Sequence, residues 1–172
     1  MTLILGIDPG SRITGYGVIR MERQRATHVA HGCIEVGELP FADRLCRIYD
    51  ALVDVLQAYH PGEAAVEKVF MNRNVDSALK LGQARGAALV AVAKAGLAVH
   101  EYAPNEIKQA IVGRGHADKG QIQHMVRTLL GLAKSPRTDA ADALAIALCH
   151  GHTRQGLMAV HGVRRARAGR YL

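Results

Sequence analysis

Residues 3–19 read LILGIDPGSRITGYGVI, and this stretch decides the fold. A continuous apolar run that ends at Ile7 is typical of a central strand buried on both faces. Turn residues break the run, and the small and apolar residues after them predict a second, antiparallel strand. Asp8 therefore stands at the end of a buried strand, where a carboxylate is costly unless a partner compensates it. The alternative is that Asp8 caps its own turn, because Asp-Pro-Gly is common turn chemistry.

The rest of the chain alternates strands with helices. Hydrophobic periodicity predicts strands over residues 27–36, 64–69 and 97–102, and helices over residues 41–59, 75–95, 105–112, 119–130 and 139–150. Short connections favour an antiparallel meander for the first three strands, whereas a strand reached through a helix lies parallel to the first. We therefore expect an α/β fold with a five-stranded mixed sheet, three antiparallel strands then two parallel ones, flanked by helices. Residues 1–152 form this domain, and residues 153–172 are expected to be a basic, flexible tail.

Composition limits the function classes. The 172 residues carry a net charge of +7, with +7 over residues 68–137 and +5 over residues 153–172. Such basic segments indicate a polyanionic partner, and nucleic acid is favoured over a membrane because no basic amphipathic helix stands out. The three cysteines lack C-x-x-C spacing, which argues against a disulfide framework or a structural zinc site. No signal peptide and no apolar run of about 20 residues is present, so we expect a cytoplasmic protein.

Three further acids can converge on Asp8. Glu67 ends a strand that a right-handed crossover places beside the first one. Asp139 and Asp142 lie three residues apart, on one face of the first turn of an Ala-rich helix. The alternative assigns both to helix capping, which the helix dipole favours. Helix capping would explain why the two acids stand at the start of the helix, but not why two other acids, Asp8 and Glu67, are expected beside them.

Four carboxylates in a small volume cannot all remain ionised without a cation. An all-oxygen shell suits Mg²⁺, with Mn²⁺ as a substitute, and two such ions about 4 Å apart would assist phosphodiester hydrolysis. Phe70 and Arg73 follow the strand that carries Glu67, in a loop suited to stacking on bases and holding phosphates. The alternative is that Phe70 packs into the core as a hydrophobic staple for the next helix.

Four motifs, in this order, resemble the RuvC family of bacterial Holliday junction resolvases from residue 3 to about residue 152. They are LGIDPGSRITGYGVI, AVEKVFMNRNVDSALKLGQARG, VGRG with DKGQIQHMVRTLL, and DAADALAIA. The resemblance implies an RNase H-like fold, a homodimer, and Mg²⁺-dependent paired nicks in two opposed strands of a four-way DNA junction. It puts the catalytic and metal-binding carboxylates at Asp8, Glu67, Asp139 and Asp142, and DNA contacts at Phe70, Lys108 and Lys119. Some relatives carry His at the position of Asp139, so here an all-carboxylate site is expected.

The same resemblance implies a role in DNA recombination and repair, a preferred short sequence at the cut, and a branch-migration motor as partner. Two other protein classes share part of this pattern. Actin-like ATPases and sugar kinases also show G-I-D-x-G, but they need a duplicated domain, for which 172 residues leave no room. A non-catalytic junction-binding protein would use the same basic surface, but it would not need four acids to converge.

Overall fold

The computed structural model describes residues 1–68, 74–113 and 118–168 of the chain. Over these residues it contains one mixed sheet with the strand order β3-β2-β1-β4-β5. The strands are β1 (Thr2–Asp8), β2 (Ile13–Glu22), β3 (Arg25–Glu35), β4 (Glu63–Glu67) and β5 (Val99–Tyr102). The first three strands are antiparallel, and β4 and β5 are parallel to β1. The expected α/β sheet is therefore confirmed.

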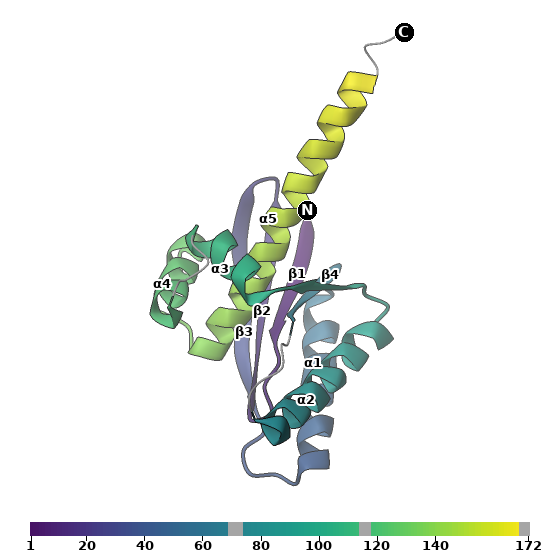
Figure 1. The fold of residues 1–172 in the computed structure, drawn as a ribbon, viewed down its shortest axis with the longest axis vertical. Helices are drawn as coiled ribbons and strands as arrows, with labels where there is room; N and C mark the ends of the chain where they lie inside the picture. The colour runs from purple at the N-terminus through teal and green to yellow at the C-terminus, as the bar shows by residue number, and fades with distance from the viewer. Residues whose placement is uncertain (69–73, 114–117, 169–172) are drawn as a thin grey trace.

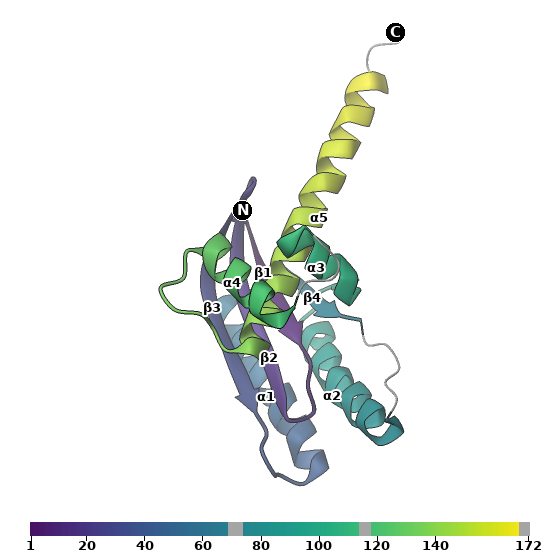
Figure 2. The same ribbon diagram turned by 60° about the vertical axis from the view of Figure 1, so that its left-hand side comes forward.

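Helices cover both faces of this sheet (Figures 1 and 2). They are α1 (Phe41–Tyr59), α2 (Val75–Lys94), α3 (Pro104–Val112), α4 (Lys119–Leu130) and α5 (Thr138–Ala168). Two separate buried clusters define the faces: one joins the sheet to α1 and α2, and the other joins it to α3, α4 and α5. The predicted capping box starts α4, where the Asp118 carboxylate accepts a hydrogen bond from the backbone N–H of Gln121 at 2.8 Å.

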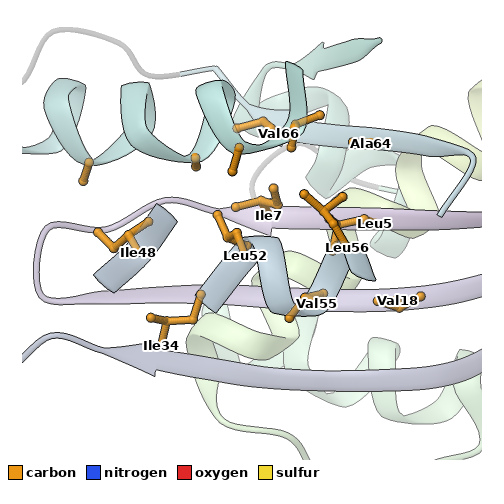
Figure 3. Close-up of a cluster of buried hydrophobic side chains, with 14 of the residues drawn as sticks. Leu5, Ile7, Val18, Ile34, Ile48, Leu52, Val55, Leu56, Ala64 and Val66 are labelled. Atoms are coloured by element: carbon orange, nitrogen blue, oxygen red, sulfur yellow. The ribbon is translucent and has the colours of Figure 1, made fainter. Parts of the chain in front are cut away.

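Alternation along the strands assigns each side chain to one of these faces. Leu5 and Ile7 of β1 point toward α1, whose apolar side chains pack over the strands (Figure 3). Ile4 belongs to the opposite cluster, beneath α5. Because the side-chain period of a strand is two, Asp8 lies on the α5 face as well. The same period places Glu67 of β4 on that face, since Ala65 packs there.

Glycines let α5 lie directly on the sheet. A Cβ atom built on Gly6 would stand 2.0 Å from the Ala143 carbonyl oxygen, and one on Gly15 would stand 2.0 Å from the Asp139 carbonyl oxygen. Real Cβ atoms do not approach this closely, so the glycines set the distance between the helix and strands β1 and β2. The start of α5 is thereby held beside the end of β1.

The last helix differs from the prediction. We expected it to end near residue 150, but α5 continues to Ala168 and projects beyond the sheet (Figure 1). Glycines in this segment lower helix propensity by only about 1 kcal/mol each, and the Ala, Leu and Arg residues between them favour the helix. The domain boundary at residue 152 and the flexibility of the tail stay predictions. No helix in the described ranges is long and apolar enough to cross a membrane.

Candidate active site

The acids predicted from the sequence gather at one end of the sheet. Asp8 ends β1 and Glu67 ends β4, and these strands are parallel neighbours, with Ile7 opposite Val66 in the register. The carboxyl ends of parallel strands meet at the same edge, so the two side chains lie next to each other on the α5 face. Asp139 lies in the first turn of α5 and Asp142 follows one turn later, and the charges of both act on Asp8.

Electrostatics shows that the four carboxylates act on each other. Burial raises the pKa of Asp8 from 3.8 to about 8, and the charges of Asp142, Glu67 and Asp139 add to the rise, against an opposing contribution from Lys119. Burial also raises the pKa of Glu67, and the charge of Asp142 adds to this. The pKa of Asp142 is raised by burial and by Asp139. Asp8 therefore belongs to a cluster whose negative charge is only partly compensated.

The two lysines expected to contact DNA lie within reach of this cluster. Lys108 is on α3 and Lys119 is the first residue of α4. Both lower the pKa of Glu67 and of Asp142, opposing the effect of burial. Phe70 and Arg73 fall outside the described residues, so their predicted roles stay predictions.

Local contacts weaken the interpretations in which the acids only cap turns or helices. In the turn after Asp8, the Thr14 hydroxyl donates to the Gly10 carbonyl at 3.0 Å and accepts from the Gly10 N–H at 3.3 Å. The turn is therefore closed by a threonine. Helix α5 begins at Thr138, one residue before Asp139, so Asp139 lies inside the first turn and not at the N-cap.

The donor set fits a hard divalent cation, because carboxylate oxygens are the ligands that Mg²⁺ and Mn²⁺ prefer. A cation would also stabilise the ionised form of Asp8, whose pKa is raised by burial and then by the neighbouring acids. Across residues 1–68, 74–113 and 118–168, no three His, Cys, Asp or Glu side chains are close enough together to hold one ion as they stand. The four acids would have to move closer together to share one ion.

Several residues that shape the site were not singled out from the sequence. Gly15 pairs with Asp8 in the register and admits the backbone of Asp139. Arg85 of α2 donates to the Glu67 carbonyl oxygen at 3.4 Å and forms an ion pair with Glu101, which ties the ends of β4 and β5 to α2. The G-Y-G spacing in β2 was the available signal for Gly15. No sequence signal pointed to Arg85, because an arginine on a helix is usually exposed to solvent.

Comparison with known proteins agrees with this arrangement. Residues 4–150 match the family model for crossover junction endodeoxyribonuclease RuvC. A protein of that name from Marinobacter nauticus is 60% identical over 158 residues, covering 92% of this chain and 90% of the relative. Another, from Tolumonas auensis, is 54% identical and covers 97% of this chain and 99% of the relative.

Solved structures give the same result. Thermus thermophilus RuvC in complex with a Holliday junction substrate has a TM-score of 0.84 and 39% identity, covering 91% of this chain and 97% of that one. The yeast mitochondrial Holliday junction resolvase Ydc2, at 11% identity and a TM-score of 0.63, shares the fold. The expected RNase H-like fold is thus confirmed. Together these matches show that the chain belongs to the RuvC family of crossover junction endodeoxyribonucleases.

Proposed function

We propose that this endonuclease resolves Holliday junctions by metal-dependent phosphodiester hydrolysis, with Asp8, Glu67, Asp139 and Asp142 as catalytic metal ligands. The observation that carries the proposal is the placement of Asp8 and Glu67 at the ends of neighbouring parallel strands, beside Asp139 and Asp142 of α5. Burial, with the charges of the other three acids, raises the pKa of Asp8 to about 8. A protein that only bound DNA would gain nothing from such a cluster, because it repels phosphates. The Thermus thermophilus relative in complex with a junction supports a four-way junction as the substrate.

In this proposal each residue has a defined task. When bound, one or two Mg²⁺ or Mn²⁺ ions supply Lewis-acid activation of the attacking water and neutralise charge on the departing oxygen. Asp8 and Glu67 provide ligands from rigid strand ends, so their positions are fixed before DNA arrives. Asp139 and Asp142 bring ligands from α5. Lys108 and Lys119 hold phosphates beside the acids, and Phe70 and Arg73 contact the DNA near the crossover.

Paired nicks require two sites, and α2 offers a surface for a homodimer. Val75, Leu79 and Val90 are 69%, 62% and 51% exposed, although they are apolar. Gly82 and Gly86 lie between them at helical spacing, with nothing within 4 Å of a Cβ at either position. Small residues at this spacing permit a second helix to approach closely. We infer that two copies of the chain form a homodimer through α2. We also infer that the protein acts in the cytoplasm and that a branch-migration motor binds the same complex.

The test is cleavage of a labelled synthetic four-way junction, with linear duplex of the same sequence alongside, in Mg²⁺, in Ca²⁺ and in EDTA. We expect symmetric nicks confined to the junction in Mg²⁺. Asp8→Asn should reduce the cleavage rate by at least about 100-fold and leave junction binding in Ca²⁺ unchanged, because the lysines remain. Asp54→Asn, which changes an exposed acid of α1, serves as the matched control. Normal cleavage by Asp8→Asn would overturn the proposed ligand set.

A further inference from the structure

A hollow of about 390 Å³ adjoins the acid cluster on the side of Asp139. The β1–β2 turn forms one wall, with Ser11 and Arg12, and the first two turns of α2 form the other, with Ser77 and Leu81. Its volume falls within the range of about 300–1,000 Å³ that is usual for ligand pockets. Nothing in the proposed mechanism uses this space.

The wall formed by the turn is held in place. The Arg12 carbonyl accepts a hydrogen bond from the backbone N–H of Val36 at 3.1 Å, which anchors the turn to the end of β3. Thr14 closes the turn through its two hydrogen bonds to Gly10. Arg44 of α1 reaches the Ser11 carbonyl at 3.5 Å. The backbone of this wall is therefore organised before a ligand binds, which lowers the ordering cost of a site formed here.

The chemistry of the lining suits one nucleotide. Arg12 is exposed, and within the described part of the chain no carboxylate pairs with its guanidinium group. Guanidinium groups bind phosphate through two parallel hydrogen bonds. The hydroxyls of Ser11 and Ser77 add donors, and Leu81 offers an apolar surface to the sugar.

The position of the hollow relative to the lysines suggests a path for the DNA strand. Lys108 and Lys119 act on Glu67 and Asp142, whereas the hollow adjoins Asp139. Positive groups thus flank the acids on two sides. A strand that passes over the acids from the lysines would place its next nucleotide at the hollow.

We infer that this hollow binds the nucleotide adjacent to the scissile phosphate in the cut strand, with Arg12 paired to the phosphate of that nucleotide. The inference rests on the proposed function, because it assumes that the strand is cut at Asp8, Glu67, Asp139 and Asp142. It adds a binding subsite that fixes the position of the strand during cleavage.

The experiment combines Arg12→Ala with a scan of the DNA backbone. Single neutral methylphosphonate linkages are placed one at a time on either side of the cut in a synthetic junction, and cleavage is measured for wild type and variant. With wild-type protein, one neutral linkage beside the cut should lower the rate by about 10-fold or more. Arg12→Ala should lower the rate on unmodified DNA by a similar factor and should be insensitive to that same linkage. Junction affinity in Ca²⁺ should show the same coupling.

Two further variants sharpen the result. Arg12→Lys keeps the charge but loses the paired hydrogen bonds, so it should restore only part of the rate. Arg47→Ala removes an exposed arginine from α1, and it should show the full effect of every neutral linkage. The subsite is refuted if every linkage affects Arg12→Ala as it affects wild type, or if Arg12→Ala behaves like Arg47→Ala. Absence of nicking by wild-type protein in Mg²⁺ would instead refute the proposed function.

Discussion

At the scale of the residue, the raised pKa of Asp8 links the acid cluster to the stability of the fold. Its pKa is about 8 in the folded chain and near 3.8 when exposed, so the folded state retains a proton that the unfolded state loses. The folded state binds more protons between these two values, and its stability falls as the pH rises through that window. An acid cluster of this kind therefore destabilises the fold increasingly as the pH rises, as long as no cation is bound to it.

Asp8→Asn removes this penalty. In EDTA at pH 8, the variant should be more stable than wild type by at least about 1 kcal/mol, and the difference should vanish at about pH 3 and below, where Asp8 is protonated in both states. Urea unfolding at the two pH values measures it. Adding Mg²⁺ at pH 8 should stabilise wild type but have less effect on Asp8→Asn. If Asp8→Asn raised the free energy of unfolding equally at both pH values, ionisation of Asp8 would not be the cause of the lower stability of wild type.

At the scale of the element, the contact between α5 and the sheet decides the geometry of the site. Gly15→Ala would place a methyl group 2.0 Å from the Asp139 carbonyl oxygen, so the start of α5 must move away. We expect a loss of stability of about 1–3 kcal/mol and a fall in cleavage of at least about tenfold, with junction binding retained. Thermal unfolding and single-turnover cleavage measure the two effects.

Gly156→Ala is the matched control for this change. Gly156 lies on α5 itself, and nothing stands within 4 Å of a Cβ at that position. The substitution should leave cleavage unchanged and should not destabilise the helix, because alanine has the higher helix propensity. If Gly15→Ala cleaved as fast as Gly156→Ala, the close approach of α5 would not control the site.

The elements also show how far the sequence can be interpreted. The apolar run before Asp8, the periodicity of α1 and the capping box at Asp118 are local patterns, and each predicted its element. The four acids were predicted because strand order and a right-handed crossover follow general rules. The contact of Gly15 with Asp139 joins residues far apart in the chain, and no local pattern encodes such a distance. The predicted end of α5 near residue 150 was wrong because the helix formers after Gly151 outweigh the glycines among them.

At the scale of the whole molecule, the two faces of the sheet have different tasks. The α5 face carries the acids and the lysines, whereas α1 and α2 close the other face over the cluster shown in Figure 3. Buried alanines hold one side of α2 against that core, and the opposite side carries the exposed apolar residues Val75, Leu79 and Val90. A twofold contact would cover this surface on both copies, since an isologous interface uses the same patch twice. The α5 face, with its acids and lysines, would then remain accessible to DNA in the dimer.

Leu79→Asp tests this assembly. A buried charge without a partner disfavours association, so we expect the dimer dissociation constant to rise by at least about tenfold, measured by sedimentation equilibrium. Leu129→Asp is the control, because Leu129 is also an exposed leucine but lies on α4.

On a plasmid that extrudes a cruciform, paired nicks give linear product and single nicks give open circles. At protein concentrations where Leu79→Asp is monomeric, linear product should decrease relative to open circles, whereas Leu129→Asp should give the wild-type ratio. A monomer that still linearises the plasmid at the wild-type rate would show that two joined sites are not needed.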